Sequence, residues 1–216
     1  MIKTEPSRNF QSAVDRAAEI LVSGGLVAYP TESFYGLAVD ATNEKAIQRL
    51  FRAKKRSGSR PVLILIPSVE ILSRYVDPIP PIALRLMETF WPGGLTLVFG
   101  AGPRVSPLLA AGTNKIGVRL SSHPVAMALT QAIGVPISGT SANISGEPAC
   151  RNADDVLACL GERVDLILDG GMTTGAAGST VLDVTVDPPR ILREGMIHQS
   201  RLEKVILNSR IPACHA

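Results

Sequence analysis

The sequence has few cysteine, histidine and aromatic residues, and these shortages exclude several classes of protein. Its cysteines, Cys150, Cys159 and Cys214, are odd in number and have no CxxC spacing, so neither a disulfide framework nor a zinc site is expected. Its three histidines are scattered and form no HExxH motif, so no metal site built by the protein is expected.

Long apolar runs and a strong net charge are also missing. No apolar run reaches the roughly 18 residues of a membrane-spanning helix. The first ten residues lack the apolar core and cleavage site of a signal peptide. We therefore expect a cytoplasmic protein without a membrane partner. The net charge of +3 does not by itself demand a nucleic-acid partner.

The 216 residues, 45% of them hydrophobic, are enough for one domain with a real core. Helical patterns are predicted over 11–23, 43–55, 68–75, 81–90, 123–133, 153–160 and 202–207. Strands are predicted over 26–29, 62–66, 95–100, 116–120, 135–137, 166–168, 180–186 and 190–192, with an irregular link over 30–40.

This interleaving of helices and strands predicts an α/β fold. The connection around Asp187 is too short for a crossover helix, so the sheet should be mixed. We expect one domain over 1–207 and a loose tail over 208–216.

A basic stretch lies at the end of one predicted helix, with six basic residues and no acidic one over 49–60. Lys54 falls on the core-facing stripe of this helix together with Ile47, where an unpaired ammonium is strongly unfavourable. Lys54 therefore either extends outward to solvent or meets a buried anion. Arg56 lies near the same place, and two such cations would suit phosphate oxygens.

The polar segment 138–146 holds four side-chain hydroxyls, one amide and two glycines, which favours a loop. This loop either caps the next helix or, at the carboxyl end of a strand, holds an anionic ligand.

Three further segments could line the same crevice. Thr31 follows a predicted strand, where its hydroxyl faces a crevice or caps its own turn. Arg119 shares a strand face with Lys115 and Gly117, where it is either solvated or holds a carboxylate in two parallel hydrogen bonds. The glycine-rich loop 170–178 could close over a ligand but lacks the lysine and spacing of a P-loop.

The sequence contains no GxSxG motif and no suggestive pair of carboxylates. Its cations, hydroxyls and backbone donors suit the positioning and charge stabilisation of phosphate and carboxylate groups rather than nucleophilic catalysis.

Taken in order, these segments resemble the YrdC family, the L-threonylcarbamoyladenylate synthases. Lys54-Lys55-Arg56 is similar to the family's Lys-x-Arg pair, and Ser141-Ala142-Asn143 is similar to its Ser-x-Asn pair. Further matches are PTES and YGL within 30–37, FWPG at 90–93, LTL at 95–97, STV at 179–181 and REG at 193–195. The resemblance covers about residues 13–198.

The resemblance implies a twisted mixed sheet with helices on its faces around a large, positively lined cavity. It implies a nucleotidyltransferase that converts ATP, L-threonine and bicarbonate or CO2 into threonylcarbamoyl-AMP and pyrophosphate. Mg2+ would be carried by the triphosphate. The product would pass to the machinery that makes N6-threonylcarbamoyladenosine in tRNA.

The resemblance also implies the site residues, with Lys54 and Arg56 as the catalytic pair and no metal held by the protein. The ATP-binding residues would be Lys54, Arg56, Lys115, Ser141, Asn143 and Arg193. The threonine-binding residues would be Thr31, Arg119 and Ser179.

Four positions depart from the family pattern and bear on fine specificity. They are Lys55 in place of a frequent glycine, Ser57 in place of proline, Arg60 in place of asparagine and Leu65 in place of histidine. The long-form enzymes carry a second C-terminal domain, so we expect this chain to be a short form.

Two other functions stay open. One is an RNA-binding module that seats tRNA or double-stranded RNA in the cavity, although an aromatic content of 4% and the lack of RNP- or KH-type motifs argue against it. The other is a related activity that forms a carbamoyl-adenylate.

Overall fold

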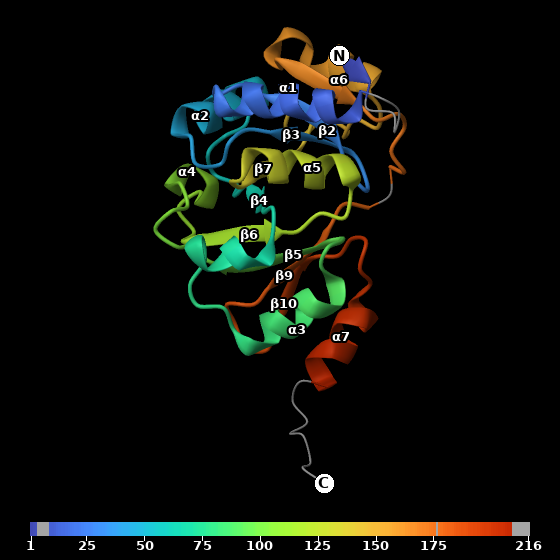
Figure 1. Ribbon diagram of the computed structural model, residues 1–216. Helices are drawn as coiled ribbons and strands as arrows, with labels where there is room; N and C mark the ends of the chain where they lie inside the picture. Colours follow the sequence, from blue (N-terminus) through green and yellow to red (C-terminus); the bar gives the residue numbers. More distant parts are fainter. Residues whose placement is uncertain (4–8, 176, 209–216) are drawn as a thin grey trace.

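The computed structural model describes residues 1–3, 9–175 and 177–208, which form a sheet with helices packed on both of its faces (Figure 1). The strands are β1 (Ile2–Lys3), β2 (Val27–Pro30), β3 (Tyr35–Ala38), β4 (Leu63–Leu65), β5 (Leu95–Gly100), β6 (Lys115–Arg119), β7 (Ile137–Ser141), β8 (Leu166–Asp169), β9 (Thr180–Asp183) and β10 (Arg190–Arg193). The helices are α1 (Phe10–Val22), α2 (Glu44–Ala53), α3 (Pro81–Phe90), α4 (Pro107–Ala110), α5 (Pro124–Ile133), α6 (Ala153–Leu160) and α7 (Gln199–Asn208), with 3-10 turns η1 (Val69–Arg74) and η2 (Gly161–Arg163). Apart from Asn208, the predicted tail over 208–216 lies outside the described residues.

The sheet is mixed, as the short connection around Asp187 predicts. Across the described strands its order is β1-β8-β2-β3-β7-β4-β6-β5-β9-β10. Strands β1 and β2 run parallel to β8, β4 runs parallel to β6, and β5 runs parallel to β9, while the other neighbours are antiparallel. The predicted α/β fold with a twisted mixed sheet is therefore confirmed.

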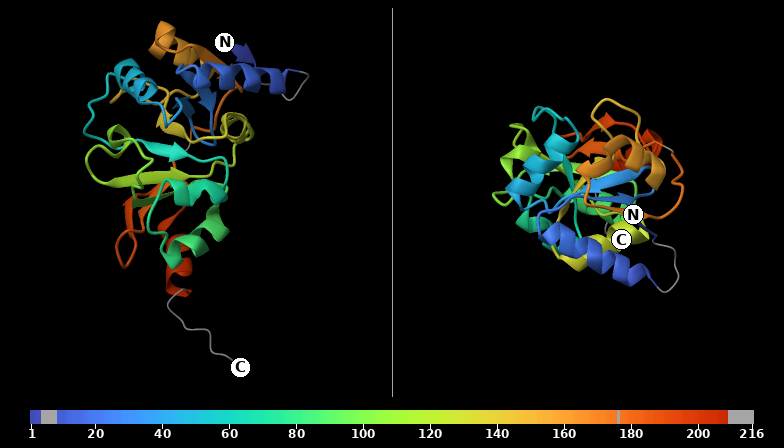
Figure 2. Two further views of the ribbon diagram at one scale, coloured as in Figure 1. Left: turned by 60° about the vertical axis from the view of Figure 1, so that its left-hand side comes forward. Right: turned by 90° about the horizontal axis from the view of Figure 1, so that it is seen from above.

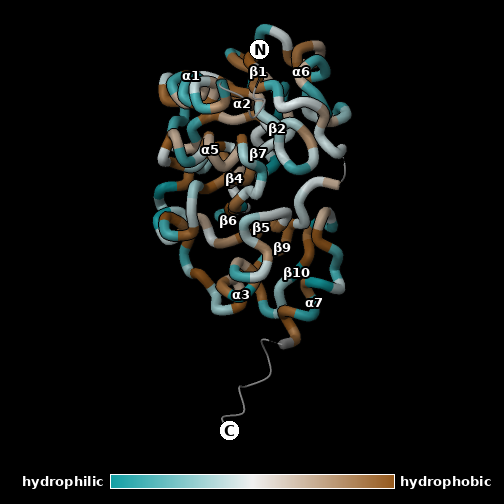
Figure 3. The backbone as a smooth tube through the Cα atoms, turned by 45° about the vertical axis from the view of Figure 1, so that its right-hand side comes forward, coloured by the Kyte–Doolittle hydropathy of each residue, from teal (hydrophilic) through white to brown (hydrophobic). Residues whose placement is uncertain are grey.

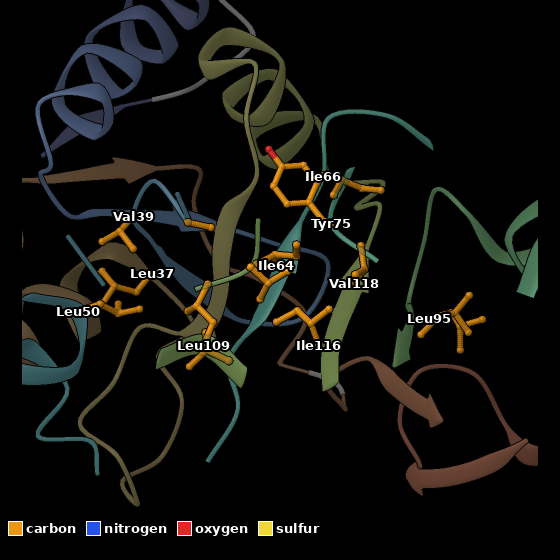
Figure 4. Close-up of a cluster of buried hydrophobic side chains, with 14 of the residues drawn as sticks. Leu37, Val39, Leu50, Ile64, Ile66, Tyr75, Leu95, Leu109, Ile116 and Val118 are labelled. Atoms are coloured by element: carbon orange, nitrogen blue, oxygen red, sulfur yellow. The ribbon is translucent and has the colours of Figure 1, made fainter. Parts of the chain in front are cut away.

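Two hydrophobic clusters lie on opposite faces of the sheet. Along β4, Leu63 and Leu65 belong to the cluster under α1 and α5, whereas Ile64 belongs to the other cluster, as the alternation of a strand requires. Helices α1 and α5 pack against each other (Figures 1 and 2). Figure 4 shows part of the second cluster, where Leu50 of α2 lies near Leu37 of β3.

The central strand β4 is hydrophobic along its length, whereas the outer helices carry both hydrophilic and hydrophobic residues (Figure 3). Helices α3 and α7 contact each other at the end of the molecule away from α1 (Figures 1 and 2). None of the helices in the described part of the chain is long and apolar enough to cross a membrane.

The prediction of an irregular link over 30–40 is wrong, because this segment contains β3. All four residues of β3 are buried, so the strand shows no alternation of polar and apolar residues that would reveal it. A tight turn closes it against β2, with the Thr31 N–H donating to the Phe34 carbonyl at 3.1 Å.

The prediction of a loop over 138–146 is wrong for its first residues. Strand β7 runs to Ser141 and lies between β3 and β4. The buried Ser138 hydroxyl donates to the Leu37 carbonyl and accepts from the Val39 N–H, each at 3.0 Å. These bonds satisfy its polar group, so a serine is tolerated inside the sheet.

Smaller differences concern short elements. The predicted helix over 68–75 is the 3-10 turn η1, and the short elements β1 and α4 were not predicted. Each is only a few residues long, so periodicity gives too weak a signal.

Candidate functional site

A cavity of about 600 Å³ lies on the sheet face that carries Leu63 and Leu65. This volume is typical of small-molecule and cofactor sites. Seven of the nine predicted site residues line it: Thr31, Arg56, Lys115, Arg119, Ser141, Ser179 and Arg193. The other two, Lys54 and Asn143, lie behind its wall and contact Ser141.

Glycines on β3, β7 and β6 make the floor of the cavity, and β4 lies between β7 and β6. A Cβ atom on Gly139 of β7 would overlap the side chain of Leu63, and one on Gly117 of β6 would lie 3.0 Å from the Leu63 Cβ. A Cβ on Gly36 of β3 would lie 2.8 Å from the ring of Tyr29. The missing side chains therefore let Leu63 and Tyr29 lie over neighbouring strands, which leaves the space above them open.

The cavity has two ends, set by the direction of β6. Lys115 and Arg119 point to the same face and, four residues apart in a strand, lie about 13 Å from each other. We call the region of Thr31, Arg119, Ser179 and Arg193 the Arg119 end. We call the region of Arg56, Lys115 and Ser141 the Arg56 end.

Arg119 is held from two sides at its own end. Its Nε donates to the Gly93 carbonyl at 2.8 Å, and its Nη2 lies 2.6 Å from the Glu32 Oε2. The second contact lacks hydrogen-bond alignment, so it is an electrostatic pair between buried charges. Nη2 is buried against Glu32 and Nε is bonded to Gly93, so Nη1 is the nitrogen left for Arg119 to offer to a ligand in the cavity that it lines.

Glu32 is a heavily bonded carboxylate. Its Oε1 accepts from the Ser121 hydroxyl, the Ser122 N–H and hydroxyl, and the His123 N–H, at 2.6 to 3.1 Å. Burial alone would raise the pKa of Glu32, but the charge of Arg119 and these hydrogen bonds outweigh burial and lower the pKa to about 2. Glu32 is therefore ionised at neutral pH.

Arg193 and Ser179 form a second bonded group at the Arg119 end. Arg193 donates to the Ser179 carbonyl from Nη2 at 2.8 Å, and the Ser179 hydroxyl lies 2.8 Å from the Thr96 hydroxyl. Burial and the charge of Arg119 lower the pKa of Arg193. No carboxylate pairs with Arg193 within the described ranges, so its charge is left for a ligand.

Thr31 satisfies both interpretations of its position. Its hydroxyl donates to the Phe34 carbonyl at 2.6 Å and accepts from the Ser33 N–H at 3.3 Å, so it caps its own turn. It also lines the cavity, as a ligand-binding threonine would.

At the Arg56 end, the last turn of α2 sets the geometry of the basic pair. The Arg56 N–H donates to the Phe51 carbonyl at 2.9 Å and the Lys55 N–H to the Arg52 carbonyl at 3.1 Å. This is a Schellman ending, in which the residue after the cap is left-handed and is usually glycine. Lys55 has φ 48°, so it adopts the conformation that the family's glycine would favour.

Lys54 does not extend outward to solvent, and among the described residues its ammonium meets neutral oxygens instead of an anion. It is 1% exposed, and its ammonium donates to the carbonyl of Ser141, to the carbonyl of Asn143 at 2.7 Å and to the Asn143 Oδ1 at 3.2 Å. Burial and the charge of Arg56 lower its pKa to about 8, which leaves it protonated at neutral pH. Lys54 thus ties the end of α2 to the segment that follows β7.

Arg56 has no carboxylate partner among the residues that the structure describes. Its Nη2 donates to the carbonyls of Arg60 at 3.1 Å and Pro61 at 2.9 Å, while its buried Nε has no partner among the residues described. Burial and the nearby Arg60 charge lower the pKa of Arg56. A buried, unpaired donor of this kind is stabilised by an anionic ligand.

Lys115 pairs with Asp183 of β9 at 2.8 Å. Burial alone would raise the pKa of Asp183, but hydrogen bonds from Lys115 and Thr185 outweigh it and hold that pKa below its ordinary value. Lys115 therefore lines the cavity with its charge already compensated.

The cavity is positively lined, as the resemblance implies. Four cations line it, Arg56, Lys115, Arg119 and Arg193, and no carboxylate does among the residues that the structure describes. Glu32 and Asp183 stand behind two of these cations. No group of three or more His, Cys, Asp or Glu within the described ranges could hold a metal ion.

Glu32, Asp183 and Tyr29 were not assigned a role from the sequence. Asp183 shares a face of β9 with Val181, which lines the cavity, so strand alternation was a usable signal. Glu32 lies within the PTES segment, but it contacts Arg119 only in the folded protein, so no local sequence pattern marks this pair. Burial raises the pKa of Tyr29, so its phenol stays neutral in the cavity wall.

The chain matches the Sua5/YciO/YrdC family, described as "Telomere recombination", over residues 19–195. It is 38% identical to the threonylcarbamoyl-AMP synthase of Bacillus subtilis (strain 168), over 89% of this chain and 56% of that protein. It is 36% identical to the putative threonylcarbamoyl-AMP synthase of Mycobacterium tuberculosis (strain ATCC 25618 / H37Rv), over 93% of this chain and 90% of that protein.

Among solved structures, P. abyssi Sua5 complexed with L-threonine is similar with a TM-score of 0.90 and 37% identity. The alignment covers 95% of this chain and 59% of that chain. The chain thus spans little more than half the length of the Bacillus and Pyrococcus proteins that it matches. By the length of the match and the identity to these relatives, the chain belongs to the Sua5/YciO/YrdC family.

Proposed function

We propose that this chain is an L-threonylcarbamoyladenylate synthase, which converts L-threonine, bicarbonate or CO2, and ATP into threonylcarbamoyl-AMP and pyrophosphate. The observation that carries the proposal is the division of the single cavity. Thr31, Arg119 and Ser179, the residues expected to bind threonine, lie at the Arg119 end, and Arg56, Lys115 and Ser141, expected to bind ATP, lie at the Arg56 end. Arg193, also expected to bind ATP, lies beside Ser179, where the two ligands would meet. The names of the Bacillus relative and of the threonine-bound Pyrococcus structure support the same activity.

The reaction needs two ligands side by side. The threonine amine adds to CO2 and loses a proton, which gives a carbamate. A carbamate oxygen then attacks the α-phosphorus of ATP, the bond from that phosphorus to the bridging oxygen breaks, and pyrophosphate leaves. Holding both reactants in one cavity turns an encounter of two molecules into a reaction within one complex.

Charge stabilisation is the main task of the side chains in this proposal. Negative charge builds on the phosphate oxygens as pyrophosphate departs, and cations must neutralise it. Arg56 and Arg193 supply uncompensated positive charge, and Arg119 holds the threonine carboxylate through Nη1. Lys54 and Asn143 act from behind the wall by positioning Ser141. ATP would enter as its Mg2+ complex, because magnesium commonly rides on phosphates with few protein ligands.

The wider role is part of the proposal. The labile product would pass to a tRNA threonylcarbamoyl-transfer machinery in the cytoplasm. The cavity volume favours a nucleotide with an amino acid over an RNA duplex as the main ligand. A role as an RNA-binding module would instead give tight, salt-sensitive RNA binding in the absence of ATP.

The test is pyrophosphate release by the purified protein with ATP, Mg2+, L-threonine and bicarbonate. We expect release that requires both threonine and bicarbonate, together with a product of the mass of threonylcarbamoyl-AMP. Arg56→Ala should reduce it strongly, whereas Arg16→Ala, which removes an exposed arginine of α1, should not. Folded protein that releases no pyrophosphate would refute the proposal.

A further inference from the structure

Glu32 lies at the junction of three segments that meet at the Arg119 end. Its carboxylate joins Arg119 at the end of β6 to the residues that begin α5. Its backbone carbonyl accepts from the Thr174 hydroxyl at 3.0 Å, and the adjacent Ser33 carbonyl accepts from the Gly175 N–H at 2.8 Å. The residue thus links the turn after β2, the start of α5 and the loop that precedes β9.

The two carboxylate oxygens of Glu32 have different partners. Oε1 is saturated by the donors of Ser121, Ser122 and His123, so it cannot turn toward a ligand. Negative charge at this place is also favoured by the N-terminus of α5. Oε2 is fully buried and faces only Arg119. Glu32 therefore cannot itself contact the substrate.

The consequence for Arg119 is a fixed orientation. Gly93 holds its Nε and Glu32 holds its Nη2, and the side chains of the pair are only 8% and 12% exposed. With Nε held by a hydrogen bond and Nη2 held by an ion pair, the guanidinium presents its third nitrogen, Nη1, to the cavity. This differs from the two parallel hydrogen bonds predicted from the sequence, because the nitrogens needed for that fork are already engaged.

We infer that Glu32 is a positioning residue of the amino-acid site, which orients Arg119 so that Nη1 alone meets the carboxylate of the substrate. It also offsets the charge of Arg119 beside Arg193, so that this end selects a correctly placed carboxylate rather than any anion. This inference rests on the proposed function, and it adds the group that makes the threonine end selective.

The test is Glu32→Gln. The amide oxygen can still accept the hydrogen bonds made to Oε1, but the NH2 group then faces Arg119, donor against donor. We expect the KM for L-threonine to rise about tenfold and the KM for ATP to stay within about twofold, because only one end is disturbed. Sulfate should compete with threonine more strongly in the variant, since the charge of Arg119 is no longer balanced.

Asp165→Asn is the matched control. Asp165 also accepts a backbone N–H, from Leu26 at 2.7 Å, and pairs with an arginine, Arg49 at 2.7 Å, but it does not line the cavity. Its loss should leave both KM values unchanged. A parallel rise of both KM values in Glu32→Gln, or no change in the threonine KM, would overturn the inference.

A milder variant covers the case in which Glu32→Gln does not fold. Ser121→Ala removes one donor to Oε1 and keeps the ion pair. It should raise the threonine KM by about twofold to threefold with the ATP KM unchanged; an unchanged threonine KM counts against the inference.

Calorimetric titration of the wild-type protein with L-threonine separates a failure of the proposed function from a failure of the role of Glu32. Absence of binding and turnover in the wild type refutes the proposed function, whereas normal wild-type behaviour with an unaffected Glu32→Gln refutes only the role of Glu32.

Discussion

The two ends of the cavity manage positive charge in different ways. At the Arg119 end, Arg119 is paired with Glu32 and Arg193 is bonded to Ser179. At the Arg56 end, Arg56 meets only neutral carbonyl oxygens and keeps a buried nitrogen without a partner in the described chain. Each end also holds a second cation, Arg193 without a carboxylate partner in the described chain and Lys115 paired with Asp183. The contrast is therefore between the two arginines Arg119 and Arg56, of which only Arg119 has a carboxylate partner among the described residues.

The two arginines suit different ligands. A small ligand with one carboxylate gains most from donors that are already oriented, because little ordering remains to oppose binding. A triphosphate carries several charges and can complete the bonding of an unsatisfied arginine. The two ends thus suit an amino acid and a nucleotide respectively, as the proposed reaction requires.

The largest expected effect is at the Arg56 end. Arg56→Ala should lower kcat/KM for ATP by at least about 100-fold, or about 2.7 kcal/mol of transition-state stabilisation. The threonine affinity, measured by calorimetry without ATP, should stay the same. Equal losses of threonine affinity and ATP use would show that the two ends are not separate.

A substitution of Lys54, which lies behind the cavity wall, should lower both the stability of the protein and its affinity for ATP. Lys54→Met leaves the carbonyls of Ser141 and Asn143 without their donor, so the free energy of unfolding should fall by about 3 kcal/mol. The KM for ATP should rise because Ser141 loses its support. Urea denaturation and steady-state kinetics measure these effects. Lys45→Met, at an exposed position of the same helix, is the control and should change neither.

The charge of Glu32 predicts a pH dependence at the Arg119 end. The pKa of Glu32 is lowered from 4.5 to about 2, so folding favours its ionised form. Its stabilisation, on the order of 3 kcal/mol, is complete above pH 4.5 and is lost as the pH falls toward 2. The difference in unfolding free energy between the wild type and Glu32→Gln should therefore shrink by about 2 kcal/mol from pH 7 to pH 3. A difference that is constant with pH would mean that the carboxylate charge does not stabilise this end.

The smallest expected effect is a gain in the free energy of unfolding when Lys55, at the Arg56 end, is replaced by glycine. Lys55 has φ 48°, which disfavours a side chain, so Lys55→Gly should raise the free energy of unfolding by about 1 kcal/mol. Lys55→Ala keeps the strain and should give no gain. Thermal unfolding of the three proteins measures this. The threonine KM should be the same in all three if the ends are independent.

Helices and strands could be predicted well from the sequence where the hydrophobic periodicity and the glycine or proline residues at the ends indicate the same bounds. Helices α3 and α6 and strand β5 have the predicted bounds. Strand β3 was missed because it is buried on both faces, and the part of β7 after Ile137 was missed because its residues are polar and small. In both cases the neighbouring strands, rather than local preference, decide the conformation.

Most residues predicted for the site do line the cavity, but their bonding partners could not be predicted. Seven of the nine predicted residues line the cavity. The acceptors of Lys54 are carbonyl oxygens 87 and 89 positions away, and every residue carries such an oxygen, so no sequence signal marks them. The pairing of Glu32 with Arg119 likewise depends on how the ends of β2 and β6 meet in the folded sheet.

The central claim is that one cavity holds an amino acid and a nucleotide at opposite ends. A crystal structure of the protein with L-threonine and a non-hydrolysable ATP analogue tests it most directly. We expect the threonine carboxylate on Nη1 of Arg119 and the outer phosphates on Arg56 at the other end, with the α-phosphate between them, all inside the cavity. Either ligand bound outside this cavity, or phosphates seated on Arg119 beside Glu32, would contradict it.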